Sequence, residues 1–291
     1  MSGTVPVAVF IPTYNRGTAI LSVLQRVEAT DPQPAEIIVH VDSANGALEK
    51  EIARVAPRAQ ILTSPTRLGP GGGRHRCLMA CKSPYAAGFD DDSYPVDKDY
   101  FRRVFDLFEA HPRAAILGAR IWHRNERELP RSDALRRVPN YVGCGYAIRL
   151  AAYKEIRGAL PRTVPYGMEE NDVALQLYLR GWEIYDSGQL RVLHDTELKH
   201  HSSAEITAGR IANVALFAFL HYPVAHWYWG LAQVANMVAF SVRHGRVRGL
   251  ISGLLSIPGD CYRNRKYRQP VDWKTMSGYL DWCRTGAMPR A

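Results

Sequence analysis

Three consecutive carboxylates, Asp90, Asp91 and Asp92, stand between the apolar residues 86–89 and a Ser-Tyr-Pro sequence. An apolar run that ends in such a turn predicts a buried strand that stops at the acids. Because side chains alternate along a strand, we expect Asp90 and Asp92 to share one face and Asp91 to take the other. Two repelling carboxylates on one face suit a hard divalent cation such as Mg²⁺ or Mn²⁺. Taken alone, the three acids fit a solvated acidic turn better.

A second acidic group, Glu169, Glu170 and Asp172, stands just before residues 173–180, whose apolar spacing predicts a helix. Carboxylates at a helix N-terminus stabilise the helix by about 0.3–1 kcal/mol each. The same position suits a general base that is held in one place for proton transfer. The residue types leave both interpretations open.

Residues 69–76 contain four glycines followed by Arg74 and Arg76. Glycines let the backbone approach a ligand closely, and N–H groups at the start of a helix attract anions. The spacing matches neither the dinucleotide-binding fingerprint nor the nucleotide-triphosphate P-loop. An anion-binding segment and a flexible loop are both open here, with a helix expected over residues 77–82.

Short apolar runs alternate with segments of helical spacing over the first two thirds of the chain. This alternation predicts an α/β fold whose mostly parallel sheet carries helices on both faces. Open sheets of this kind bind ligands at the carboxyl ends of their strands, where this chain has Thr13, Asp42 and His194. The polar residues 122–138 predict a surface loop. The expected strands are residues 5–12, 36–43, 60–63, 86–89, 114–121, 141–148 and 191–195.

The 291-residue chain has a net charge of +9 and a pI of about 9.4, which favours anionic partners such as nucleotide phosphates, nucleic acid or an anionic membrane face. Its length and its 46% apolar content predict one large domain, alone or with an appendage. Five cysteines without paired spacing predict reduced thiols in the cytoplasm, and we interpret Cys77 and Cys81 as packing residues. No basic and then apolar leader is visible, so we expect no signal peptide.

The C-terminal residues 205–291 differ in composition from residues 1–204, which we expect to form the α/β domain. Residues 211–242 contain no Asp, Glu, Lys or Arg, but Pro223 and several polar side chains interrupt them. We therefore expect two helices that meet near Pro223 rather than one helix that spans a membrane.

Basic clusters at residues 243–248 and 263–268 lie on either side of the apolar residues 250–257. Cationic groups beside apolar helices favour binding to the anionic inner face of a membrane. The alternative is a helical subdomain, or a homo-oligomer contact through these helices, with a solvated basic rim.

Taken together in their order along the chain, the polar strand ends, the glycine-rich segment and the two acidic groups resemble those of the inverting family-2 glycosyltransferases of the GT-A fold, such as those that assemble bacterial polysaccharides and glycolipids. The resemblance runs from Ile11 to His194. His75 and Cys77 depart from the family's glycine–Ala-Arg-Asn segment, so Arg74 carries over more directly than its neighbours. The nucleotide-sugar contacts that the resemblance implies are Pro12, Thr13, Tyr14, Arg16, Asp42, Gly69, Arg74, Asp90 and Asp91.

The three acids also resemble the family's Asp-x-Asp metal motif. His194 resembles the histidine that completes the metal shell in some members. The implied ligands of a Mn²⁺ or Mg²⁺ ion are therefore Asp92, as the most direct ligand, His194 and Asp90.

Glu170 stands eleven residues before Gly181, which Trp182 follows, and this spacing matches the family's catalytic base. Because the family usually has Asp at this position, Glu169 and Asp172 remain alternatives. The residues implied on the acceptor side are Gly143, Tyr166, Gln176 and Trp182.

The resemblance implies the transfer of a sugar from a nucleotide-sugar, with UDP as the expected nucleotide, to a hydroxyl of a glycan or of a lipid-linked acceptor. The metal and Arg74 would neutralise the charge of the leaving diphosphate. The base would take the proton of the acceptor hydroxyl as its oxygen attacks, and one direct displacement inverts the anomeric carbon.

The expected location is the cytoplasm, including the inner face of the cell membrane, and nucleic acid is not an expected partner. Two other classes stay open. One is a catalytically silent scaffold that binds nucleotide-sugars or glycans. The other is a sugar-phosphate nucleotidyltransferase, which would need a lysine beside a glycine-rich loop near the N-terminus that this chain lacks.

Overall fold

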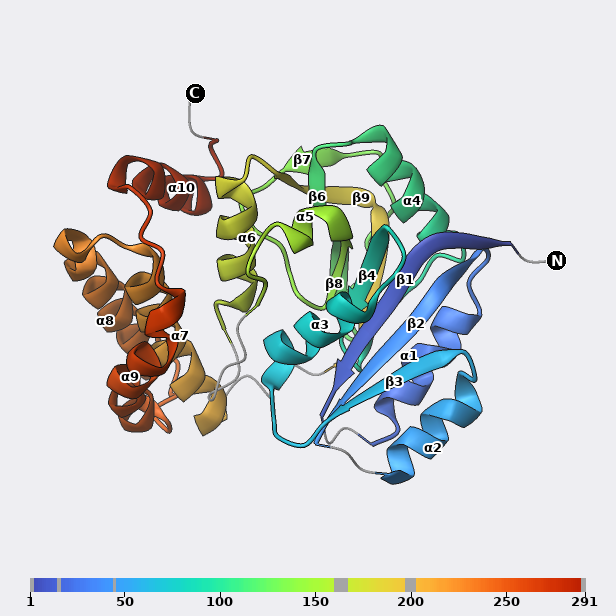
Figure 1. The fold of residues 1–291 in the computed structure, drawn as a ribbon, viewed down its shortest axis with the longest axis horizontal. Coiled ribbons are helices and arrows are strands. Elements are labelled where there is room, and N and C mark those ends of the chain that lie inside the picture. The colour runs from blue at the N-terminus through green and yellow to red at the C-terminus, as the bar shows by residue number, and fades with distance from the viewer. Residues whose placement is uncertain (1–2, 15–16, 44–45, 160–166, 197–202, 289–291) are drawn as a thin grey trace. The chain divides into compact units, whose positions relative to one another are not determined.

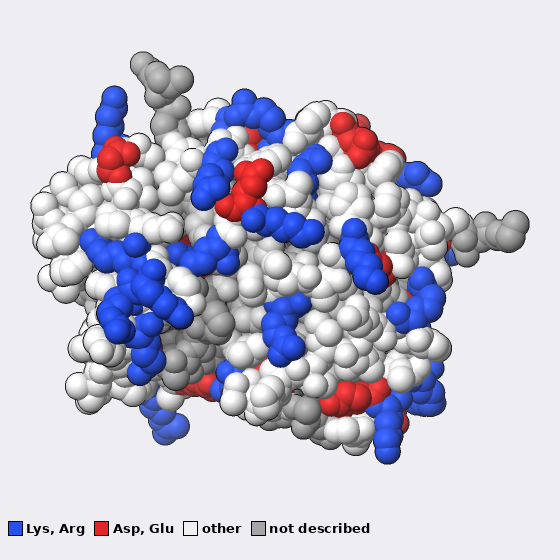
Figure 2. Space-filling view, in the orientation of Figure 1, with Lys and Arg blue, Asp and Glu red and all other residues white. Residues whose placement is uncertain are grey.

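The computed structural model describes residues 3–14, 17–43, 46–159, 167–196 and 203–288, and it divides into two compact units (Figure 1). The first unit comprises Met1–Pro161 and Val173–Glu197. The second comprises Arg162–Asp172 and Leu198–Ala291. Lys and Arg outnumber Asp and Glu in the sequence, and Figure 2 shows their side chains spread over the face in view.

The first unit is built on a mixed sheet, and the expected α/β class is confirmed. Strands β1, β2, β3 and β4 pair in parallel, as do β6 and β9, whereas β8 runs antiparallel to both β4 and β6. Six of the nine described strands, β1 to β4, β6 and β9, therefore run in the same direction, and only β8, β5 and β7 are reversed, so the expected mostly parallel sheet is confirmed. In sheet order the strands are β3 (Ala59–Ser64), β2 (Gln33–Asp42), β1 (Thr4–Thr13), β4 (Tyr85–Phe89), β8 (Gly145–Arg149), β6 (Ala114–His123), β9 (Glu183–His194) and β5 (Ser93–Pro95), and β7 (Leu135–Arg137) also pairs with β9.

Helices cover both faces of this sheet, which explains why its strands are apolar on both sides. Along β1, Val7 and Val9 belong to one buried cluster, whereas Ala8 and Phe10 belong to another. The first cluster includes residues of α1 (Ala19–Glu28), α2 (Gly46–Val55) and α4 (Tyr100–Ala110). The second includes residues of α3 (Gly69–Ala80), α5 (Leu150–Lys154) and α6 (Glu169–Leu179). Cys77 and Cys81 lie in the second cluster, so their predicted role in packing is confirmed.

Several predicted boundaries were wrong, and helix α3 is the most informative case. It begins at Gly69 and includes all four glycines, although we expected a helix only from Cys77. At Gly73, a Cβ atom would come within 2.9 Å of His40 Nδ1 and 3.1 Å of Pro12 Cβ. A glycine is therefore needed here for close packing of the helix on β1 and β2, whatever it does for a ligand.

Three strands also differ from the prediction, because pairing with β9 or β6 creates or lengthens them. The Ser-Tyr-Pro sequence forms β5 rather than a turn, since it pairs with the end of β9. The expected surface loop contains β7, which pairs with Ser187 and its neighbours. Strand β9 begins at Glu183, well before the expected start at Arg191, because it continues alongside β6.

The second unit is helical, and its first two long helices meet near Pro223 as predicted. Its elements are α7 (Ala204–His221), η2 (Val224–His226), α8 (Trp227–Arg243), α9 (Leu250–Asn264), η3 (Arg265–Tyr267) and α10 (Trp273–Thr285). Small residues let the helices approach, since a Cβ at Gly230 would lie 2.5 Å from Ala218 Cβ. Within the described ranges, we find no helix with both the length and the apolarity needed to cross a membrane.

A substitution at Gly249, which lies against Ala204, tests how closely α7 and α9 approach each other. Gly249 has a φ of +93°, and its Cβ would lie 2.0 Å from the carbonyl oxygen of Ala204, whereas Gly245 has a φ of +67° and open space around it. Gly245→Ala should cost only the strain of left-handed backbone, roughly 1–2 kcal/mol. Gly249→Ala should cost that strain plus about 1–3 kcal/mol of overpacking. Urea unfolding of the two variants measures the difference, and equal losses would contradict the contact.

Candidate active site

The three acids lie in a turn between β4 and β5 that Ser93 holds closed. The Ser93 N–H donates to the Asp90 carbonyl at 3.1 Å, which is the bond of a β-turn. The Ser93 hydroxyl accepts the Asp90 N–H at 2.8 Å and donates to the Cys144 carbonyl at 2.6 Å. Ser93 is fully buried, so these bonds are shielded from water. This serine therefore fixes the backbone from which all three carboxylates project.

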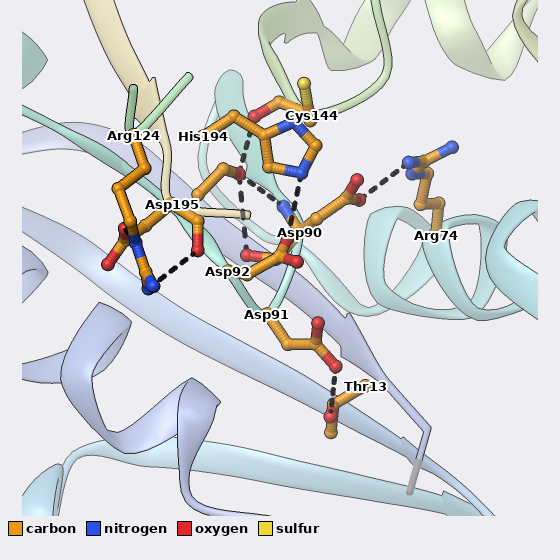
Figure 3. A network of polar contacts seen from close by, with 10 residues as sticks. Thr13, Arg74, Asp90, Asp91, Asp92, Arg124, Cys144, His194 and Asp195 are labelled. Carbon is orange, nitrogen blue, oxygen red and sulfur yellow. Dashed lines mark hydrogen bonds and ion pairs between the residues drawn. The ribbon is translucent and has the colours of Figure 1, made fainter. Parts of the chain in front are cut away.

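Each of the three carboxylates has its own partner (Figure 3). Asp90 Oδ1 accepts from Arg74 Nη2 at 2.7 Å, and Asp91 Oδ2 accepts from Thr13 Oγ1 at 2.7 Å. Asp92 Oδ1 lies 3.1 Å from His194 Nε2. The expected strand alternation does not apply, because β4 ends at Phe89 and the acids follow it in a turn. The acids nevertheless contact Arg74 and His194, as the sequence predicted.

Asp90, Cys144 and His194 form a cluster in which one ligand atom of each residue lies within 4.8 Å of the others. The carboxylate oxygens of Asp90 and the imidazole nitrogen of His194 are donors that could hold a divalent ion such as Mn²⁺ or Mg²⁺. Asp92 reaches the cluster through its contact with His194. Burial raises the pKa of the Cys144 thiol well above its ordinary value; Asp90 adds to this shift and Arg74 opposes it.

Strand pairing brings Cys144 and His194 to the acids. Ser93 of β5 is opposite His194 of β9, and Phe89 of β4 is opposite Gly145 of β8. Cys144 was not among the predicted site residues, although residues 141–148 were predicted to form a strand with glycines. Its place in the site depends on which strands are neighbours in the sheet, and one strand alone does not reveal its neighbours.

Asp42 ends β2 as expected, but its carboxylate is already bound within the chain. It accepts from the backbone N–H groups of Leu68 and Gly69, each at 2.9 Å, and from Ser64 Oγ at 2.9 Å. The start of the glycine-rich helix α3, which we expected to attract an external anion, therefore already holds this carboxylate. Nearby, Tyr14 is partly exposed and the Arg67 guanidinium lies 4.2 Å from the centre of its ring.

The second acidic group lies in the first turn of α6, which begins at Glu169 rather than at Val173. Residues 169–172 belong to the second unit, and the rest of the helix belongs to the first. Asp172 is fully buried and its Oδ1 lies 2.6 Å from Nε2 of His221, the last residue of α7. Glu169 is buried, and its Oε2 has no hydrogen-bond partner among the described residues, whereas Glu170 is partly exposed. No sequence signal pointed to His221, because 49 residues separate it from Asp172.

The residues expected on the acceptor side are held by contacts within the first unit. The Gln176 amide accepts from the Arg157 N–H at 3.0 Å, and Trp182 Nε1 donates to Glu155 at 2.8 Å. Gly181 has a φ of +78°, which ends the helix just before Trp182. Gly143 is buried beside Cys144. The expected residues Arg16 and Tyr166 lie outside the described residues.

A family model, Glycosyl transferase family 2, matches residues 8–159, which begin within β1, include the acidic turn and end just after α5. This is more than half of the chain. The chain belongs to glycosyl transferase family 2. It is accordingly a glycosyltransferase, as the sequence analysis expected. No curated protein sequence matches the chain.

Solved glycosyltransferase structures resemble this family-2 chain in fold. A Pyrobaculum calidifontis mannosyltransferase in complex with GDP-Man and Mn²⁺ aligns with a TM-score of 0.58 and 14% identity, over 96% of this chain and 86% of that one. S. aureus TarS 1-349 in complex with UDP-GlcNAc aligns with a TM-score of 0.61 and 18% identity, over 96% and 87%. GalNAc-T7 with UDP, GalNAc and Mn²⁺ aligns with a TM-score of 0.62 and 12% identity, over 90% of this chain and 57% of that one. The expected GT-A fold is confirmed.

The contact between Asp172 and His221 predicts a stability effect. Because both side chains are buried, His221→Phe keeps the ring but removes the nitrogen that contacts Asp172, and it should cost about 1–3 kcal/mol. Asp281→Asn is the matched control, since its pair with Arg284 is exposed and should change stability by less than about 0.5 kcal/mol. Thermal unfolding measures both. A His221→Phe protein as stable as the control would show that the contact contributes nothing.

Proposed function

We propose that this family-2 glycosyltransferase is a metal-dependent, inverting enzyme that transfers a sugar from a UDP-sugar to a hydroxyl of a glycan or lipid-linked acceptor. The observation that carries the proposal is the cluster of Asp90, Cys144 and His194 beside Asp92 and Arg74. These candidate metal ligands and the Arg74 guanidinium lie close to the C-terminal ends of β4 and β9 and the N-terminal end of β8, beside the turn that Ser93 closes. Mn²⁺ and nucleotide-sugars bound to proteins of the same fold support it.

The metal proposal assigns Mn²⁺ or Mg²⁺ to Asp92, His194 and Asp90. Such an ion supplies positive charge for the oxygens of a leaving diphosphate. Arg74 contacts Asp90 and is only 8% exposed. Its guanidinium would add a second positive charge beside the diphosphate. Thr13 would hold Asp91 in place for the sugar or the ribose. Pro12, Tyr14, Arg16, Asp42 and Gly69 complete the proposed nucleotide side.

For the proton transfer we propose Glu170 as the base. The acceptor hydroxyl gives its proton to the Glu170 carboxylate, its oxygen bonds to the anomeric carbon, and the bond from that carbon to the diphosphate breaks. The burial of Asp172 against His221 supports a structural role for that acid. Glu169 is buried as well, which leaves Glu170 as the most exposed of the three carboxylates in this turn.

The remaining parts of the proposal concern the acceptor and the location. Gly143, Tyr166, Gln176 and Trp182 are proposed to border the acceptor, with Gln176 and Trp182 oriented by their contacts to Arg157 and Glu155. The cytoplasm and the inner face of the cell membrane are the proposed location. All five cysteines lie in the described part of the chain and are free thiols, which agrees with a reducing compartment.

The metal assignment predicts that EDTA abolishes turnover and that Mn²⁺ or Mg²⁺ restores it. Asp92→Ala should weaken UDP binding in the presence of Mn²⁺ by about tenfold or more, because the metal links the protein to the diphosphate. Calorimetry with UDP, with and without Mn²⁺, measures this effect. Asp106→Ala, an exposed acid on α4, is the control and should bind UDP like the unaltered protein. Binding that ignores metal in all three proteins would remove the assignment.

The base assignment predicts that Glu170→Gln lowers kcat by about 100-fold or more with little change in donor affinity, because a base acts mainly in the transition state. Glu169→Gln is the matched control from the same helical turn and should keep most of its turnover. The measurement is UDP release together with the anomeric configuration of the product. Near-normal turnover of Glu170→Gln would transfer the role to a neighbour, and a retained configuration would refute single displacement.

A further inference from the structure

Helix α8 exposes most of its apolar side chains instead of burying them. Tyr228 is 58% exposed, Trp229 48% and Leu231 70%. The buried residues of this helix are Gly230, Val234 and Ser241, which are small or medium in size. An exposed cluster of large apolar and aromatic side chains marks a surface that binds something.

Helix α9 also exposes a stripe of apolar side chains at helical spacing. Ile251, Leu255 and Tyr262 are 74%, 76% and 65% exposed, and Pro258 between them is exposed as well. Gly253 packs against Ala208 and Ile211 of α7, on the opposite side of the helix from the stripe. We call the exposed residues of the two helices the docking face, and its members are Trp227, Tyr228, Trp229, Leu231, Ile251, Leu254, Leu255, Pro258 and Tyr262.

The charge around the docking face is mainly positive, and the one acid of α9, Asp260, is buried and pairs with Arg263 at 2.7 Å. Between Glu205 and Asp260 the sequence contains no acidic residue, while Arg243 ends α8 and Arg246 and Arg248 follow it. At the C-terminal end of α9, residues 263–266 contain three more basic residues, namely Arg263, Arg265 and Lys266. Figure 2 shows Lys and Arg gathered over the region where Figure 1 draws α9 and the segment after it.

Two guanidinium groups lie over aromatic rings in this region, and such pairs suit the interface between lipid and water. The Arg265 guanidinium lies 3.9 Å from the centre of the Tyr262 ring, and Arg268 lies 5.1 Å from that of Trp227. Arg, Trp and Tyr present apolar bodies to acyl chains and polar ends to the headgroups. Because no described helix can cross a bilayer, α8 and α9 would lie along its surface.

We propose that the docking face binds the surface of an anionic lipid bilayer, with its aromatic and aliphatic side chains among the acyl chains and the flanking Arg and Lys at the phosphates. The charge selects the occupant, because an apolar face rimmed mainly by cations matches anionic lipids. This inference deepens the membrane location in the proposed function by naming the face and the lipid class. It rests on the second unit alone and does not depend on the transfer chemistry.

The test is co-sedimentation of the full chain with phosphatidylcholine vesicles, with or without an equal part of phosphatidylglycerol. We expect binding to the anionic vesicles and little to the neutral ones, with weaker binding at high salt. Ile251→Ser with Leu255→Ser should lower the affinity about tenfold or more by removing apolar contact. Arg248→Gln with Lys266→Gln should lower it by a similar factor, since each cation near an anionic surface contributes about fivefold.

The matched controls change the same residue types elsewhere in the chain. Met79→Ser removes a 55% exposed apolar side chain from α3, and Arg54→Gln removes an exposed cation from α2. Both should bind vesicles like the unaltered protein. Unchanged binding by the docking-face variants, or no binding by the unaltered protein, overturns the proposal.

A second copy of the chain is the competing occupant, so the oligomeric state is measured on the same variants. If Ile251→Ser with Leu255→Ser dissociates an oligomer, the face is a subunit interface and the lipid proposal fails. UDP release is measured in parallel without vesicles, with a water-soluble acceptor. Loss of vesicle binding with intact turnover confirms that docking and catalysis are separate, whereas an unaltered protein that binds vesicles but never turns over contradicts the proposed activity alone.

Discussion

The hydroxyl of Ser93 is the interaction on which the candidate site depends. It accepts the N–H of Asp90 and donates to the carbonyl of Cys144, so one buried atom joins the acidic turn to the segment that carries the thiol. A buried hydroxyl with both bonds made is costly to replace, because the groups it leaves would have lost their partners. The backbone of Ser93 also pairs with His194 across β5 and β9. Ser93 therefore fixes the relative positions of the acids, of the segment that carries the thiol, and of the histidine.

The mixed sheet explains how residues so far apart in the chain reach that point. Parallel β1, β2 and β4 bring Thr13 and the acids to one edge, which is the edge where open α/β sheets bind ligands. Antiparallel β8 then enters beside β4, so its first residues rather than its last ones lie near the acids. This reversal is what places Cys144 in the site. A sheet with β8 in parallel would bring Arg149 there instead.

The sequence predicted those parts of the site that have local signals. The acids at a strand end, Arg74 after the glycines and His194 at the end of a strand were all recognisable from residue type and position, and the structure brings them together. Cys144 and His221 were missed because their partners are distant in sequence and their roles depend on which elements are neighbours. The extent of β9 and the start of α3 were also missed, since pairing with β6 and close packing at Gly73 override the local pattern. The two helices around Pro223 were predicted because proline acts locally.

The carboxylate of Asp42 at the start of α3 has a consequence for the energetics of any diphosphate that binds this fold. Many nucleotide-binding proteins neutralise phosphates with the positive end of a helix, and they then need no cation from solution. Here the chain supplies its own counterion to that helix end, through the N–H groups of Leu68 and Gly69. Under the proposed function, neutralisation of the diphosphate would fall to Arg74 and to a divalent cation from solution. The affinity for the donor would then depend on the free concentration of divalent ions in the cell, so that metal supply would limit the rate of the enzyme.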